Sequence, residues 1–320
     1  MARAGDPLAT PSHRGVAGER QQAPLLERQD IRALERLSVA SLDTILAGLV
    51  GERAGPGQAA GFEFSDYRRY TPGDNVSRID WSIYARLHEL HVRTSPQEAG
   101  VRLSVLLDAS RSMDSGEPSK LHYGRRLAAL LGAVALLRRD ALEVNLLSDG
   151  DSVSSGSFDS GAGALGALVD ELERLPAGRT TELARSIRRA GKSGWQPQLA
   201  VLISDGLQAS DELAAALAEL ARGARSAALV HVRDPADALG RWDGSTLLRD
   251  SETGRELDAT LTAAVWDSYA ARYARWCAQI EAQCRASGLH YVNADASRDP
   301  LELLIATART RSLVRTAPPS

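Results

Sequence analysis

Long apolar segments are missing from this sequence. No run approaches the roughly twenty consecutive apolar residues that cross a bilayer, and the first residues contain no apolar segment followed by a cleavage site. Cysteine is also scarce, since the chain has only Cys277 and Cys284. On a helix this spacing separates the two by roughly 10 Å along the axis, beyond the reach of a disulfide. The sequence therefore predicts a cytoplasmic protein without a membrane span, in which both thiols are buried and reduced.

A surplus of positive charge is missing too. The 320 residues carry a net charge of −3, and the sequence pI is about 6.1. Nucleic-acid backbones attract proteins with clustered excess Lys and Arg, so the composition argues against a nucleic-acid partner. Hydrophobic residues make up 43% of the chain, which is enough to fill a substantial core. We therefore expect a globular protein.

Composition and patterning divide the chain into four parts. Residues 1–24 are rich in Ala, Gly, Pro, Gln and Arg without periodicity and predict a disordered tail, and residues 311–320 predict a second flexible tail. Residues 25–100 predict a helix, from the apolar spacing over 30–50, followed by a small β-rich region around a Pro-Gly-Asp turn. Residues 101–310 predict one α/β domain.

Apolar strands alternate with helices in this last part. The run over 198–204 is apolar on both faces, as parallel strands covered by helices are. We therefore expect a doubly wound, Rossmann-like sheet, whose ligands bind at the carboxyl ends of its strands. The expected strands cover residues 101–107, 141–147, 151–155, 198–204, 226–232 and 289–293, with a hairpin around 246–258. The expected helices cover residues 118–139, 161–175, 182–191, 210–222, 260–287 and 299–309.

One strand end carries a compact set of oxygen-bearing side chains. An apolar run ends on Asp108, and the next loop carries Ser110 and Ser112. Carboxylate and hydroxyl oxygens suit Mg²⁺ or Mn²⁺ rather than zinc, which favours thiolate and imidazole. The alternative is that the serines cap the next helix, because such a pattern arises by chance in roughly one chain in ten of this length. A partial repeat at Asp295 and Ser297 precedes an expected helix, and we interpret these two as loop and cap residues.

Two later loops offer further oxygens. Asp205 follows the expected strand over 198–204, and a parallel sheet brings that strand end to the same edge as Asp108. Thr181 lies in the loop before another expected helix, with Thr180 as the alternative. Taken singly, Asp205 and Thr181 are explained equally well as helix caps.

Together these loops resemble the metal-ion-dependent adhesion site of the von Willebrand factor A domain. The resemblance spans residues 101–310 and implies the following ligands for Mg²⁺ or Mn²⁺: Ser110 and Ser112 directly, and Asp108, Thr181 and Asp205 directly or through water. It also implies that an Asp or Glu of a partner completes the coordination shell. The expected fold is thus an α/β, doubly wound von Willebrand factor A-type domain with a small N-terminal β-rich region and a preceding helix.

The segment over 64–87 resembles the signature of the bacterial "domain of unknown function 58" proteins. The matching positions are Tyr70, Pro72, Gly73, Asp74, Arg78, Asp80, Trp81, Ala85 and Arg86. Members of that family are associated with MoxR-type AAA+ ATPases, so the resemblance implies an adaptor or co-chaperone of such an ATPase. Within the signature, Arg78, Asp80, Trp81 and Arg86 form either structural packing between the small region and the sheet or a surface for a partner.

A magnesium-dependent phosphohydrolase of the haloacid dehalogenase type is the alternative function. Such enzymes need a second aspartate two residues after the nucleophile, and this chain has Ser110 at that place. We therefore expect a non-enzymatic, metal-dependent protein-binding module. Because the loops are expected at an exposed edge of the sheet, we also expect Asp108→Ala and Asp205→Ala to leave the fold largely intact.

Overall fold

The computed structural model describes most of the predicted α/β domain and parts of the region before it. The described residues are 23–36, 67–69, 90–93, 101–148, 152–159, 161, 163–174, 182–191, 197–238, 244–249 and 255–315. The predicted N-terminal tail lies outside them up to residue 22. The four signature residues Arg78, Asp80, Trp81 and Arg86 also lie outside them. Both candidate threonines, Thr180 and Thr181, do as well.

The N-terminal part contributes one helix and two short strands to the described chain. Helix α1 (Arg28–Glu35) overlaps the start of the helix predicted over 30–50, and the rest of that helix lies outside the described residues. Strands β1 (Tyr67–Arg69) and β2 (His91–Arg93) pair antiparallel in a sheet of their own. The boundary proposed at residue 100 stays a prediction.

A six-stranded sheet forms the centre of the molecule, with the strand order β10-β7-β6-β3-β4-β5. Five strands are parallel, and β5 pairs antiparallel with β4 at one edge. The strands are β3 (Arg102–Asp108), β4 (Ala141–Ser148), β5 (Ser152–Phe158), β6 (Leu199–Ser204), β7 (Ser226–Arg233) and β10 (His290–Asp295). The predicted doubly wound α/β architecture is confirmed.

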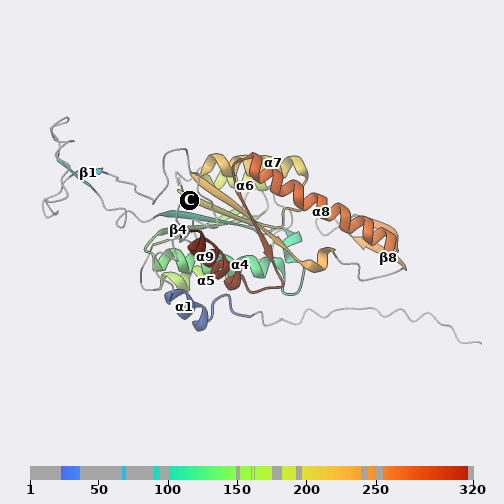
Figure 1. The fold of residues 1–320 in the computed structure, drawn as a ribbon, viewed down its shortest axis with the longest axis horizontal. Helices are drawn as coiled ribbons and strands as arrows, with labels where there is room; N and C mark the ends of the chain where they lie inside the picture. Colours follow the sequence, from blue (N-terminus) through green and yellow to red (C-terminus); the bar gives the residue numbers. More distant parts are fainter. Residues whose placement is uncertain are drawn as a thin grey trace, which may run out of the picture.

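Helices cover both faces of this sheet, as Figure 1 shows. One face packs against α1, α4 (Lys120–Leu137), α5 (Ala164–Arg174) and α9 (Pro300–Arg315), and the other against α6 (Leu183–Ala190), α7 (Ser210–Gly223) and α8 (Ala263–Ala286). Successive strand residues point to opposite faces, so Val201 and Ile203 join the first core while Ala200 and Leu202 join the second. Both faces of β6 are therefore apolar because both are covered.

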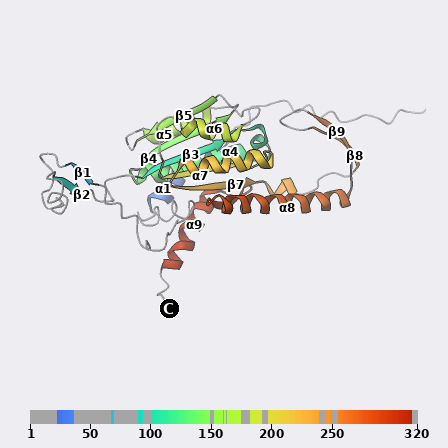
Figure 2. The ribbon, with the colours of Figure 1, turned by 90° about the horizontal axis from the view of Figure 1, so that it is seen from above.

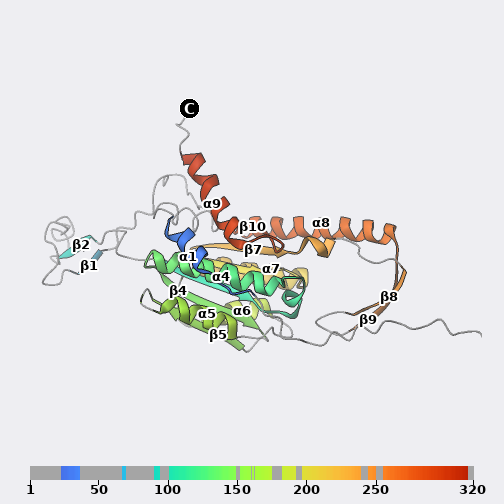
Figure 3. The ribbon, with the colours of Figure 1, turned by 90° about the horizontal axis from the view of Figure 1, so that it is seen from below.

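Helix α8 extends beyond the sheet. Figures 2 and 3 show its outer end beside the antiparallel pair β8 (Gly244–Arg249) and β9 (Glu256–Leu261). This hairpin exposes apolar side chains, among them Leu257, which is 64% exposed. Cys277 and Cys284 lie on the inner half of α8 as buried free thiols, as predicted. None of the described helices is long and apolar enough to cross a membrane.

The end of α9 differs from the prediction. The sequence predicts a helix that ends at residue 309 and a flexible tail from 311, whereas α9 continues to Arg315. No Gly or Pro interrupts the chain between Leu301 and Ala317, so nothing in the local sequence stops the helix earlier.

Candidate metal site

The candidate site lies between two neighbouring strands whose following helices pack on opposite faces of the sheet. From β3 the chain continues into α4 on one face, and from β6 into α7 on the other face. The loops after these two neighbouring strands therefore diverge to opposite faces of the sheet, and ligands of doubly wound sheets bind at such a position. Leu107 of β3 pairs with Ile203 of β6, which places Asp108 beside Ser204.

Asp108 is fully buried and surrounded by neutral donors. Its Oδ1 accepts a hydrogen bond from the Ser110 amide at 2.9 Å, and its Oδ2 accepts bonds from Ser204 Oγ at 2.7 Å and Gln208 Nε2 at 3.0 Å. Burial raises the pKa of Asp108 and the charge of Asp205 raises it further, while the hydrogen bonds from Ser204 and Ser110 oppose both. Ser204 and Gln208 were not among the predicted site residues.

The two serines of the motif connect the two carboxylates. Ser110 Oγ lies 3.0 Å from Ser112 Oγ, and Ser112 Oγ donates to Asp205 Oδ1 at 3.2 Å. The short helix η2 (Arg111–Asp114) makes the turn, with Arg111 exposed between the two buried serines. The hydroxyls thus form a continuous polar row with the carboxylate of Asp205, the first residue after β6.

The backbone at Asp205 is held from behind by a histidine. His231 Nε2 lies 3.0 Å from the Asp205 carbonyl oxygen, and His231 Nδ1 lies 2.8 Å from the Tyr291 hydroxyl. Burial and the charge of Arg233 lower the pKa of His231 to about 4, so its ring is neutral at physiological pH. A carbonyl only accepts, so Nε2 donates to Asp205 and Nδ1 accepts from Tyr291.

Gly206 allows the sharp exit from β6. Its φ of +65° lies in the left-handed region, which side chains rarely adopt. A Cβ at this position would also meet Ile280 Cδ1 at 3.0 Å. The Gly206 amide donates to Ser204 Oγ at 3.0 Å, which orients the hydroxyl that binds Asp108.

A lysine that the sequence interpretation overlooked completes the site. Lys120 is 1% exposed, and its Nζ lies 2.7 Å from Asp205 Oδ2 and 3.4 Å from Asp237 Oδ2. Burial alone lowers the pKa of Lys120, but the charges and hydrogen bonds of Asp205 and Asp237 outweigh it and hold the pKa above its usual value. Its position in the sequence could have identified it, because it follows the motif loop directly and begins an apolar helix.

These contacts correct one expectation. The carboxylates of Asp108 and Asp205 are 0% and 2% exposed, so they do not lie at an exposed edge. Replacing Asp205 with Ala leaves the Lys120 ammonium buried without its nearest carboxylate, which is strongly destabilising. The premise of an exposed edge is therefore wrong, and for Asp205→Ala we now expect a marked loss of stability in place of an intact fold.

The structure brings Asp108, Ser110, Ser112 and Asp205 together and keeps the partial repeat apart. Ser297 Oγ donates to Asp295 Oδ1 at 2.6 Å in an exposed turn after β10. Ser297 thus lies in a turn as interpreted, whereas Asp295 is the last residue of β10 and Asp299, not either of these two, accepts from an amide of the first turn of α9. The roles of the first four residues as metal ligands stay a prediction, as does that of Thr181 or Thr180.

The chemistry of the four residues fits a hard cation. Two carboxylates and two hydroxyls present oxygen alone, the donor type that Mg²⁺ and Mn²⁺ take. Within the described ranges, no three or more His, Cys, Asp or Glu residues lie together as they do in a dedicated metal cage. The set therefore fits a weakly held ion that keeps several of its waters.

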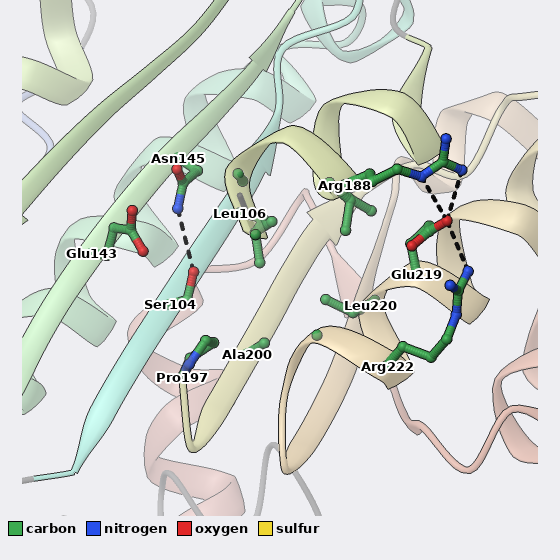
Figure 4. A pocket seen from close by; sticks show the side chains of 14 residues that line it. Ser104, Leu106, Glu143, Asn145, Arg188, Pro197, Ala200, Glu219, Leu220 and Arg222 are labelled. Carbon is green, nitrogen blue, oxygen red and sulfur yellow. Dashed lines mark hydrogen bonds and ion pairs between the residues drawn. The ribbon is translucent and has the colours of Figure 1, made fainter. Parts of the chain in front are cut away.

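A separate cavity opens toward the amino-terminal ends of the same strands. It has a volume of about 260 Å³ and is lined by Ser104, Glu143 and Asn145 on the sheet, as Figure 4 shows. Arg188 and Arg222 both pair with Glu219 at its side. This cavity belongs to the opposite end of the sheet from the candidate metal site.

Comparisons with known proteins found both curated relatives and solved structures to which this chain is similar. It is 26% identical to the uncharacterized proteins Rv1480 of Mycobacterium tuberculosis and Mb1516 of Mycobacterium bovis, over 88% of this chain and 88% of each relative. Among solved structures it is similar to BatB from Bacteroides thetaiotaomicron, with 19% identity and a TM-score of 0.39 over 67% of this chain and 100% of that one. It is also similar to a von Willebrand factor type A protein from Catenulispora acidiphila, with 17% identity and a TM-score of 0.33 over 45% of this chain and 35% of that one.

The family comparison covers most of the described domain. The model of the family described as "Protein of unknown function DUF58" matches residues 66–279, which is more than half of the chain. The match begins before β1 and ends within α8, so it includes residues 66–87 of the signature segment and the loops of the candidate site. The chain therefore belongs to the DUF58 family.

Proposed function

We propose that this protein is a non-enzymatic, metal-ion-dependent protein-binding module that serves as an adaptor or co-chaperone of a MoxR-type AAA+ ATPase. One observation carries the proposal: the side-chain oxygens of Asp108, Ser110, Ser112 and Asp205 are linked by hydrogen bonds at the carboxyl ends of β3 and β6. Doubly wound sheets bind their ligands at this position. The family resemblance supplies the kind of partner.

The arrangement separates the two serines from Asp108 by the way in which they would hold Mg²⁺ or Mn²⁺. The hydroxyls of Ser110 and Ser112 are the direct ligands. Both oxygens of Asp108 already accept hydrogen bonds from protein donors, so this carboxylate holds the ion through water. When bound, the cation supplies an electrophilic position that an Asp or Glu of the partner completes.

The surroundings of the site favour binding over hydrolysis. Position 110, where a phosphohydrolase needs its general acid, holds a serine whose hydroxyl contacts Ser112. His231, which contacts the Asp205 backbone, uses both ring nitrogens to hold Asp205 and Tyr291 in place. Lys120 is likewise engaged with carboxylates. None of these groups is placed to transfer a proton to a substrate.

The signature segment is the second surface that the proposal takes into account. Its four residues lie outside the described part of the chain: Arg78, Asp80, Trp81 and Arg86. They would contact the partner if the metal site does not. Binding of the partner at the metal site needs a divalent cation, whereas binding at the signature segment does not. Whether partner binding depends on Mg²⁺ therefore distinguishes the two surfaces.

A capture experiment with matched serine variants tests the proposal. Purified wild-type protein is used to capture partners from a lysate of its host, with Mg²⁺ or with EDTA, and the captured proteins are identified by mass spectrometry. We expect a MoxR-type ATPase or its client in the Mg²⁺ sample alone, and we expect Ser112→Ala to lose it.

Ser297→Ala is the control for this experiment. It removes a hydroxyl that also donates to an aspartate, at 2.6 Å from Asp295, but in an exposed turn away from the site. It should capture the same proteins as the wild type, with both variants shown to be folded by thermal melts. Equal capture by Ser112→Ala in Mg²⁺ would contradict the metal mechanism and shift the contact to the signature segment.

A further inference from the structure

The buried ammonium of Lys120 has no role in the function proposed above. It lies on the first residue of α4, where the helix dipole disfavours a positive charge. Its side chain is among the largest fully buried ones of the described chain. A buried lysine needs a charged partner, and Asp205 Oδ2 provides one at 2.7 Å. The candidate metal site, and not the helix, therefore explains where Lys120 lies.

Both oxygens of Asp205 are engaged in this arrangement. Oδ1 accepts from Ser112 Oγ and from the Leu207 amide, each at 3.2 Å, and Oδ2 holds the Lys120 ammonium. One carboxylate thus separates the ammonium from the serine hydroxyls. A divalent cation at those hydroxyls is repelled by the nearby Lys120 ammonium. Because the site is buried, water and salt screen this repulsion only weakly.

A second carboxylate offers the ammonium another position. Asp237 lies on the short helix η4 (Pro235–Ala238), and its Oδ2 is 3.4 Å from Lys120 Nζ. Asp237 is 28% exposed, while Asp205 is 2% exposed. The flexible lysine stem can turn toward Asp237, which frees Asp205 without leaving the ammonium unpaired.

We propose that Lys120 is a built-in competitor of the divalent cation, whose ammonium neutralises Asp205 in the metal-free protein and moves to Asp237 when Asp205 turns to the metal. This inference rests on the metal site of the proposed function and adds its regulation. Because the ammonium opposes the cation, metal alone binds weakly. The carboxylate of a partner adds the negative charge that offsets this repulsion, so metal and partner bind more tightly together than the metal does alone.

Calorimetric titration of the full chain with Mg²⁺ tests the proposal, at one pH and one ionic strength. Lys120→Met keeps an unbranched side chain that is one atom shorter and removes its charge, so we expect this variant to bind Mg²⁺ about tenfold more tightly than the wild type, or better. Mg²⁺ should also raise its melting temperature by more than it raises that of the wild type. Equal or weaker binding by Lys120→Met overturns the role of Lys120 and leaves the metal site standing.

Asp237→Asn is expected to have the opposite effect on Mg²⁺ binding. This variant keeps Lys120, so the test does not require a protein that folds without the lysine. It removes the alternative partner of the ammonium, so we expect Mg²⁺ binding about threefold weaker than in the wild type, or weaker still. Asp234→Asn is its control, because it removes the same charge three residues earlier, and among the described residues the ion pairs of Lys120 are with Asp205 and Asp237.

The outcomes separate the two proposals. Weaker binding by Asp237→Asn than by Asp234→Asn supports the competition even if Lys120→Met fails to fold, and equal binding by these two variants overturns it. Mg²⁺ binding by none of the proteins, the wild type included, overturns the metal site itself.

Discussion

The pair of Lys120 and Asp205 determines how the site affects stability. Both side chains are almost fully buried and their charged atoms lie 2.7 Å apart. Removing one partner of a buried ion pair leaves the other charge without compensation, at a cost of about 3–5 kcal/mol. We expect Asp205→Asn to lower the free energy of unfolding by about that amount in urea denaturation.

The double variant Lys120→Met/Asp205→Asn is the internal control for this prediction. Because it removes both charges, it should recover a large part of the stability that Asp205→Asn loses. A single variant as stable as the wild type would mean that the ion pair does not form in solution.

At the residue scale, the sequence located the aspartates and serines but not their neighbours. Asp108, Ser110 and Ser112 lie within five positions, and Asp205 directly follows an apolar strand, so a local pattern identifies them as candidates. Lys120 becomes a site residue only through a carboxylate 85 positions later. Ser204 is likewise 96 positions from the carboxylate that it binds. Contacts over such separations follow from the strand order, which no local pattern contains.

At the element scale, β4 carries an acidic residue beneath a helix-covered face. Glu143 is 4% exposed, and its Oε2 is buried without a hydrogen-bond partner among the described residues. Burial raises the pKa of Glu143, and a hydrogen bond with Asn145 opposes the shift only partly. The folded protein thus holds its proton more tightly than the unfolded chain does.

The sign of the resulting pH dependence follows from linkage. A group with a raised pKa in the folded state stabilises the fold at low pH, and this contribution is lost as the pH rises from the unfolded to the folded pKa. We therefore expect the free energy of unfolding to fall between the ordinary glutamate pKa and the raised pKa of Glu143. The free energy of unfolding of the Glu143→Gln variant should fall less over the same pH range, as measured by urea denaturation at a series of pH values. Parallel pH dependences for the variant and the wild type would contradict the raised pKa of Glu143.

The positions of the helices and strands along the sequence were predicted better than the way in which they pack against one another. Apolar runs and their spacing gave each strand and helix of the α/β domain to within a few residues. The alternation of Leu142, Glu143 and Val144 is also typical of a strand with one solvated face. The structure instead covers that face with α6 and leaves a cavity over Glu143, because helix placement depends on the whole sheet.

At the scale of the whole molecule, the hairpin β8–β9 differs from the core in its dependence on packing. Leu257 of the hairpin is 64% exposed, while Leu130 of α4 is fully buried. We expect Leu130→Ala to lower the free energy of unfolding by about 2–5 kcal/mol and Leu257→Ala to change it by less than about 0.5 kcal/mol. Chemical denaturation of the two variants measures both effects, and a similar loss in both would place the hairpin within the cooperative core.

The position of β3 between β4 and β6 also fixes the order in which the molecule is completed during synthesis. One edge of β3 pairs with β4 soon after both emerge from the ribosome, but the other edge waits for β6, almost a hundred positions later. Until then an apolar strand keeps an open row of amides and carbonyls, which is a template for pairing with other chains. Such distant pairing also slows folding. A nascent chain that stalls before β6 therefore exposes an aggregation-prone edge beside Asp108, and release from that state requires the very strand that brings Asp205.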